Sequence, residues 1–134
     1  MRKFELERID LADPLEEKHT VYKLKINGRC EFDKFYDKTM RSGNNKIHME
    51  KAINYLRLRA VNDMNIPNRI KFLGPDEFEV KAKQIRLYAF VLPKRGDIIV
   101  LGEIKKGKGK QSKNIERMRE IKAEFLKQFK DEAY

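Results

Sequence analysis

The sequence predicts an α+β fold, with a small antiparallel sheet, an N-terminal helical hairpin and a C-terminal helix. The chain has 134 residues, which is the usual size of one domain. Apolar residues alternate with polar ones near the start of the chain and again in its second half, as they do in strands. Two stretches between these strands, and one after them, instead repeat their apolar residues at helical spacing. We therefore expect a single domain over residues 1–134.

The first clear strand pattern covers residues 20–27. Every second residue is apolar and lysines occupy the positions between, which is typical of a strand with one buried face. Asn27-Gly28 follows and is a strong signal for a tight turn. Upstream, residues 3–11 fit an imperfect strand or an extended arm, which Asp13-Pro14 ends.

Two helices are predicted next, and together they form the helical hairpin. The first has apolar residues at helical spacing between Phe32 and Met40, and the cap and turn residues 42–45 follow it. The second has a sustained apolar stripe from Met49 to Ala60 and stops before Pro67.

The second half of the chain predicts a three-stranded antiparallel meander, after a strand-like stretch at residues 70–73. Residues 78–83 alternate, residues 85–92 are apolar on both faces as in a central strand, and residues 98–104 are apolar and β-branched. Residues 93–97 are expected to form the hairpin loop between the last two strands. Arg86 is the exception, because it is a charged residue inside the most apolar strand.

The C-terminal helix is predicted after a basic, glycine-punctuated loop at residues 105–110. Its apolar stripe runs from Ile115 to Phe129 and indicates a face that docks on the sheet. From Glu103 to Lys122, eight basic residues stand against three acidic ones, so basic charge is concentrated in this part of the chain.

Charge is the strongest compositional signal for function. Thirty-one Lys and Arg residues against 21 Asp and Glu residues give a formal net charge of +10. Such a field attracts polyanions and makes their binding salt-dependent, which indicates nucleic acid as the partner. A basic protein without a polyanionic partner is the alternative.

Cysteine and histidine usage argues against disulfides, metal sites and cofactors. Cys30 is the only cysteine, and His19 and His48 lie far apart without other ligands at metal-binding spacing. No apolar run approaches the length that spans a bilayer. We expect a cytoplasmic protein with no metal, no cofactor and no membrane partner.

Two stretches carry a resemblance to a known family. They are residues 78–91, Phe-Glu-Val-Lys-Ala-Lys-Gln-Ile-Arg-Leu-Tyr-Ala-Phe-Val, and residues 98–106, Ile-Ile-Val-Leu-Gly-Glu-Ile-Lys-Lys. The order of basic strand, Arg followed by apolar residues, hairpin, apolar strand, Lys pair and helix resembles the RelE/ParE-like toxin superfamily of bacterial toxin–antitoxin systems. The resemblance covers roughly residues 68–128. Residues 20–66 agree in element order alone, and residues 1–18 look like an N-terminal addition.

The resemblance implies a RelE-like domain and the toxin component of a type II toxin–antitoxin system. RNA-cleaving members of the superfamily are metal-independent endoribonucleases that cut messenger RNA, often on the ribosome. The implied partners are RNA, the ribosome and a cognate antitoxin with an acidic, helical segment. Other members act on DNA gyrase, so a non-hydrolytic nucleic-acid-binding or gyrase-directed relative, or an inactive protein-binding relative, stays open as an alternative.

The same resemblance nominates catalytic residues. Arg86 matches the arginine that contacts the reacting phosphate, and its planar fork suits phosphate oxygens. The structural alternative for Arg86 is an ion pair with Glu77, Glu79 or Glu103. Lys81 and Lys83 match the basic cleft positions, and are expected to project together from one strand, although a solvated lysine face would have the same pattern.

Further residues are candidates for binding RNA. Lys105 and Lys106 match the basic residues at the end of the last strand, and the loop residues Lys108 and Lys110 extend that charge. Tyr88 shares the face of Arg86, so it is a candidate for stacking on a base, with core packing as the alternative. The last helix lacks the tyrosine or histidine that RNA-cleaving relatives commonly carry there; Tyr134 is the nearest substitute.

Overall fold

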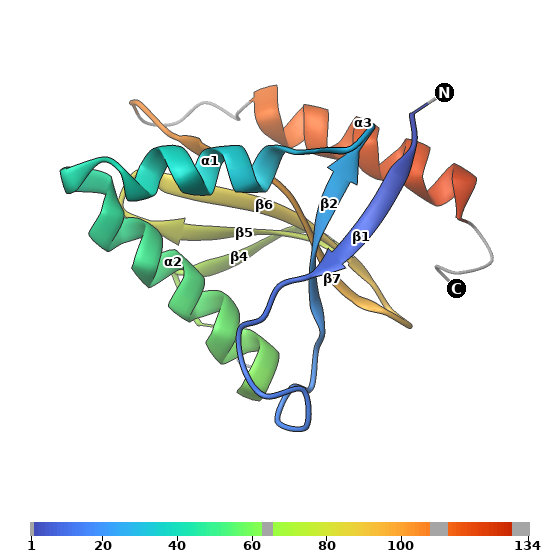
Figure 1. Ribbon diagram of the computed structural model, residues 1–134, viewed down its shortest axis with the longest axis horizontal. Helices are drawn as coiled ribbons and strands as arrows, with labels where there is room; N and C mark the ends of the chain where they lie inside the picture. The colour runs from blue at the N-terminus through green and yellow to red at the C-terminus, as the bar shows by residue number, and fades with distance from the viewer. Residues whose placement is uncertain (1, 63–65, 108–112, 130–134) are drawn as a thin grey trace.

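A computed structural model describes residues 2–62, 66–107 and 113–129 of the chain. It confirms the α+β class: an open, mostly antiparallel sheet has helices α1 and α2 on one face and α3 on the other (Figure 1). The three helices are α1 (Glu31–Met40), α2 (Gly43–Asn62) and α3 (Lys113–Gln128).

Within the described residues the sheet has seven strands in the order β1-β2-β7-β6-β5-β4, with β3 paired to β2 outside this path. It is therefore larger than the small sheet predicted from the sequence. The strands are β1 (Phe4–Arg8), β2 (Val21–Ile26), β3 (Arg29–Cys30), β4 (Ile70–Gly74), β5 (Glu77–Ala82), β6 (Ile85–Leu92) and β7 (Gly96–Ile104).

Strands β4 to β7 form a continuous antiparallel meander, as their alternating sequences indicate. The sheet then departs from the antiparallel prediction, because β2 pairs parallel with β7. Helices α1 and α2 lie between β2 and the meander along the chain, and such a crossover allows parallel pairing. Residues 1–18, expected as an addition, contribute the edge strand β1, which pairs antiparallel with β2.

The tight turn predicted at Asn27-Gly28 is confirmed. Both residues have positive φ, at 52° and 79°, and they connect β2 to β3. Cys30 then caps α1, since its sulfur accepts a hydrogen bond from the backbone N–H of Asp33 at 3.5 Å. Burial raises the pKa of the Cys30 thiol.

Two hydrophobic cores lie on opposite faces of the sheet. On one face, the apolar stripe of α2, including Met49 and Leu56, packs on residues of β5 and β6 such as Val80 and Leu87. Gly102 lets α1 approach β7, because a Cβ at this position would clash with the Phe35 ring. On the other face, α3 packs on the alternate residues of β6 and β7.

A buried ion pair ties α2 to the start of β7. Arg59 donates from Nε and Nη2 to the two carboxylate oxygens of Asp97, at 2.8 and 3.1 Å. The side chains are 7% and 0% exposed, and the guanidinium lies 4.7 Å from the centroid of the Phe78 ring. The pair also corrects the predicted loop at residues 93–97, because β7 begins at Gly96 and Asp97 is already buried inside the sheet.

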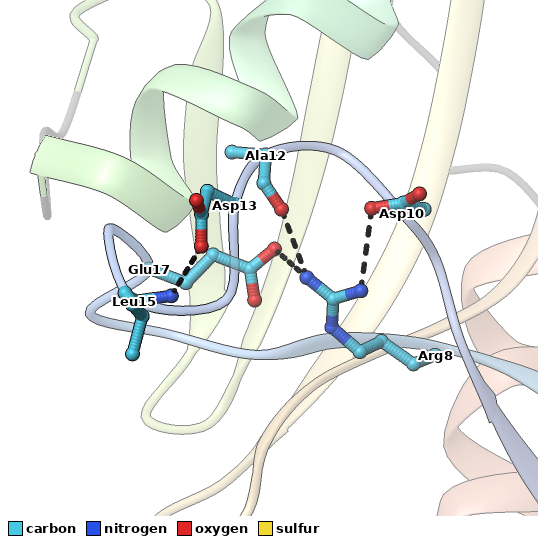
Figure 2. Close-up of polar contacts among 6 residues, drawn as sticks. All are labelled: Arg8, Asp10, Ala12, Asp13, Leu15 and Glu17. Atoms are coloured by element: carbon cyan, nitrogen blue, oxygen red, sulfur yellow. Dashed lines mark hydrogen bonds and ion pairs between the residues drawn. The ribbon is translucent and has the colours of Figure 1, made fainter.

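The segment between β1 and β2 is held by Arg8 (Figure 2). Its guanidinium donates to the Glu17 carboxylate at 2.7 Å, to the Ala12 carbonyl oxygen at 3.0 Å and to Asp10 at 3.3 Å. The backbone N–H groups of Lys18 and His19 both donate to the Ala60 carbonyl oxygen, which joins this segment to the end of α2. No helix in the described ranges is long and apolar enough to cross a membrane.

Candidate active site

A row of charged side chains crosses the sheet on the face that carries α3. Val80, Ala82, Ile85 and Leu87 point into the core under α1 and α2, so alternation turns Lys81 and Arg86 to the opposite face. Lys81 lies directly opposite Arg86 on β6, and Arg86 lies opposite Glu103 on β7. The predicted positions 81 and 86 are therefore cross-strand neighbours.

Lys81 and Arg86 border a hollow of about 500 Å³, which we call the sheet hollow. Four of its lining residues are basic and one is acidic, so phosphate oxygens would find several cations in it. The lining residues are Asn68, Ile70, Lys71, Glu79, Lys81, Arg86 and Lys105.

Arg86 is held in place by the turn between β5 and β6. Its Nη1 donates to the backbone carbonyl oxygens of Lys83 at 2.6 Å and Ile85 at 3.0 Å. The residue is 9% exposed, so the guanidinium is fixed at the wall of the hollow. Of its three proposed structural partners, Glu77 is bonded instead by Arg119 and Lys122, whereas Glu79 and Glu103 lie on the same face of the sheet as Arg86.

Lys83 does not project from the strand beside Lys81, as the sequence pattern predicts. Strand β5 ends at Ala82, and Lys83 with Gln84 forms the two-residue turn to β6. Lys83 has φ 54°, and its side chain lines a neighbouring hollow that also includes Lys81. The expectation that residues 81 and 83 share one strand face is therefore wrong, although both flank the same end of the β5–β6 hairpin.

The remaining candidates, which are the lysines at and after the end of β7 and Tyr134, divide into three groups. Lys105 lines the sheet hollow, and its N–H donates to the Gln84 carbonyl oxygen at 2.7 Å, which brings the end of β7 to the β5–β6 turn. Lys106 is exposed and next to it in the chain. Lys108, Lys110 and Tyr134 lie outside the described residues.

Tyr88 does not serve as an accessible stacking platform in this structure. It is 0% exposed and belongs to the core under α3. This burial matches core packing, the alternative to base stacking, because the ring has no surface that a base could reach.

Two charged lining residues, Lys71 and Glu79, were not predicted as site residues from the sequence. They lie opposite each other on β4 and β5, and Glu79 is next to Tyr88 on β6. Glu79 lies two residues before Lys81 in the same strand, so the alternation of side chains could have placed it on this face from the sequence alone. Lys71 depends on the pairing of β4 with β5, which a single sequence does not reveal.

The arrangement can bind and polarise a phosphodiester. Arg86, Lys81, Lys71 and Lys105 supply positive charge for phosphate oxygens, and Glu79 supplies a carboxylate that can accept a proton. The described residues contain no group of three or more His, Cys, Asp or Glu side chains that could hold a metal ion. In comparisons with protein-family models and with curated proteins, nothing matches this chain.

Proposed function

We propose that this protein is a metal-independent endoribonuclease that cleaves messenger RNA at the ribosome, as the toxin of a type II toxin–antitoxin system in the cytoplasm. The observation that carries the proposal is the sheet hollow, whose lining combines four cations with one carboxylate. The net charge of +10 and the resemblance of residues 68–128 to the RelE/ParE-like superfamily support it.

The proposed reaction is attack of a ribose 2′-oxygen on the adjacent phosphorus. Glu79 accepts the 2′-hydroxyl proton as the O2′–P bond forms, and Arg86 stabilises the charge on the phosphorane oxygens. The ammonium group of Lys81 donates a proton to the 5′-oxygen as the P–O5′ bond breaks. The products are a 2′,3′-cyclic phosphate and a 5′-hydroxyl end, so the reaction consumes no metal, water or cofactor in this step.

The test is induced expression in a bacterial host, comparing the intact chain with Arg86→Ala and Glu79→Gln. We expect the intact chain to arrest growth and to create new messenger-RNA ends, mapped by primer extension, with 5′-hydroxyl termini. Loss of one preorganised charge that stabilises a transition state costs about 10²–10³-fold in rate, so Arg86→Ala should abolish the new ends. Purified protein that has been treated with EDTA and then dialysed should cleave messenger RNA on added ribosomes at the rate of untreated protein.

The matched control is Lys94→Ala. Lys94 is an exposed cation in the β6–β7 turn, at the other end of β6 from Arg86 (Figure 1). Because Arg86 also bonds to the β5–β6 turn, the thermal unfolding of each variant is measured. Cleavage by folded Arg86→Ala and Glu79→Gln at the rate of the intact chain would contradict the proposed site.

An antitoxin is the proposed partner. An acidic, helical segment laid over the sheet hollow would neutralise Lys71, Lys81 and Lys105, and would block access of RNA to Arg86.

A second function is favoured by one feature of the same hollow. Its lining includes no histidine or tyrosine among the described residues, and these are the residues that RNA-cleaving relatives commonly use. The second candidate is thus a non-hydrolytic toxin that binds nucleic acid or acts on gyrase. Growth arrest without new RNA ends would favour it, and unaffected growth would favour a protein-binding relative.

A further inference from the structure

We propose that a second hollow, beside the sheet hollow, binds the unpaired nucleotide that flanks the reacting phosphate and stacks its base against Tyr55 and Arg69. This inference rests on the proposed function in so far as it takes single-stranded RNA as the ligand. We call this second site the Tyr55 hollow. Its polar and aromatic lining is Lys51, Tyr55, Arg69, Lys81, Lys83 and Gln84, and its volume is about 430 Å³.

The two hollows share a lining residue at the end of the β5–β6 hairpin. Lys81 lines both of them. Along the chain entering β4, Asn68 and Ile70 line the sheet hollow, whereas Arg69 between them lines the Tyr55 hollow. An RNA strand whose phosphate lies at Arg86 can therefore pass Lys81 and place its neighbouring nucleotide in the second hollow.

The charge of the Tyr55 hollow favours a polyanion. All four charged residues that line it are basic: Lys51 from α2, Arg69 before β4, and Lys81 and Lys83 from the β5–β6 hairpin. No carboxylate is among its described lining residues, so it differs from the sheet hollow, where Glu79 is present. A phosphodiester backbone would be attracted to both hollows, but the carboxylate suited to proton transfer is in the first alone.

The aromatic side chain of Tyr55 favours a nucleotide, rather than a simple anion, as the ligand of this hollow. Tyr55 is half-buried, with its inner part packed against the core of α2 and the sheet, and the Arg69 guanidinium lies 5.8 Å from its ring centroid. Tyrosine rings and arginine planes are the side chains on which unpaired RNA bases stack. An acidic peptide would require the lysines but not this pair.

The position of the hollow also follows from the fold. Helix α2 packs against β5, and Tyr55 in the middle of the helix lines the same hollow as Lys81 and Ala82 at the end of the strand. Lys83 extends the basic rim at the turn even though its φ of 54° is unfavourable for a side chain with a Cβ. The second hollow is thus built by α2, the β5–β6 turn and the residue before β4.

The test measures binding of short, fluorescein-labelled RNA by anisotropy, with every 2′-hydroxyl methylated so that the 2′-oxygen cannot attack. The intact chain is compared with Tyr55→Leu, which removes the ring, and with Tyr55→Phe, which keeps it. Base–aromatic stacking contributes enough that Tyr55→Leu should weaken binding about 5- to 150-fold, whereas Tyr55→Phe should bind like the intact chain. Lys94→Ala serves as the distant control, and thermal unfolding verifies that Tyr55→Leu is folded.

A series of oligonucleotides with one abasic sugar at successive positions then tests the stacking itself. At one position the abasic sugar should weaken binding to the intact chain but not to Tyr55→Leu, because the same contact is already missing.

Equal affinity of Tyr55→Leu and the intact chain would overturn the inference, even if cleavage at Arg86 is observed. Binding that depends on the ring, without cleavage of unmodified RNA, would support the inference while the endonuclease proposal fails. If a polyglutamate peptide binds and the oligonucleotide does not, the inference is overturned together with the RNA ligand.

Discussion

At the scale of one residue, Lys83 adds a positive charge to the Tyr55 hollow but adopts a backbone conformation that lowers the stability of the fold. It occupies the first position of a two-residue hairpin turn with φ 54°, where glycine and asparagine are the favoured residues. A left-handed backbone conformation costs an ordinary L-residue about 1–2 kcal/mol. The turn therefore carries a lysine that local backbone energetics disfavour.

We predict that Lys83→Asn raises the free energy of unfolding by about 0.5–1 kcal/mol, because asparagine tolerates this conformation better. The same change should weaken oligonucleotide binding several-fold, because a cation leaves the rim of the Tyr55 hollow. Urea denaturation and anisotropy measure the two effects. Lys94→Asn is the control: it makes the same substitution in the β6–β7 hairpin turn, where the residue does not have positive φ, and it should change neither quantity. Unchanged stability of Lys83→Asn would contradict the assigned strain.

The residues of the candidate site were predictable to different degrees for physical reasons. Alternation places Lys81 and Arg86 on one face because each belongs to a regular strand. The same alternation misplaces Lys83, since a two-residue turn interrupts the period and the pairing that fixes the turn is not visible in one sequence. Tyr88 fits either a stacking or a packing role until the position of α3 is known.

At the scale of elements, Glu77 forms a polar link between α3 and the sheet. Its carboxylate accepts from Arg119 Nε at 2.7 Å and from Lys122 Nζ at 3.1 Å, and Arg119 also donates to the Leu73 carbonyl oxygen at 3.1 Å. Burial alone would raise the pKa of Glu77. The hydrogen bonds from Arg119 and Lys122 outweigh burial, so the pKa lies below its ordinary value of 4.5.

The lowered pKa of Glu77 predicts a specific dependence of stability on pH. A carboxylate whose pKa is lower in the folded state stabilises the fold above its unfolded pKa, and this contribution is lost as the pH falls through the folded pKa. We expect Glu77→Gln to lower the free energy of unfolding by about 1–2 kcal/mol at pH 7, where the hydrogen bonds to a charged group are intact. The difference between the variant and the intact chain should begin to shrink below about pH 4.5, in urea titrations at several pH values. Glu116→Gln, on an exposed position of α3, is the control; a difference for Glu77→Gln that does not change with pH would contradict the assignment.

Most elements could be predicted from the sequence, but their assembly could not. The helical stripes and alternating strands depend on local periodicity, which is why α1, α2, α3 and the meander were found. The parallel pairing of β2 with β7 joins segments from opposite halves of the chain, and nothing local encodes it. Asp97 was assigned to the hairpin loop at residues 93–97, yet it is buried in the sheet, where its charge is paired with Arg59 from α2.

At the scale of the whole molecule, the two hollows lie near the start of the β6 strand, and the turn that carries Lys94 lies at its other end. From Arg86 to Lys94 the chain advances eight residues, which corresponds to roughly 25 Å along a strand. This separation exceeds the Debye length of about 8 Å at physiological ionic strength. A positive charge at Lys94 therefore contributes to the net charge but is screened from a strand bound in the hollows.

This separation leads to a prediction about salt. Each phosphate that a bound single strand places against the protein releases counterions, and the slope of log K against log salt concentration is about −0.7 per phosphate. If the strand follows both hollows, with about three to five phosphates in contact, the slope for the intact chain should be about −2 to −4.

Lys81→Gln should make the slope less steep by about 0.7, because Lys81 lines both hollows. Lys94→Gln lowers the net charge by the same amount and should leave the slope unchanged, since its cation contacts no phosphate. Anisotropy titrations of the methylated oligonucleotide over a range of salt concentrations measure all three slopes. Equal decreases for the two variants would mean that net charge, rather than the path through the hollows, determines binding.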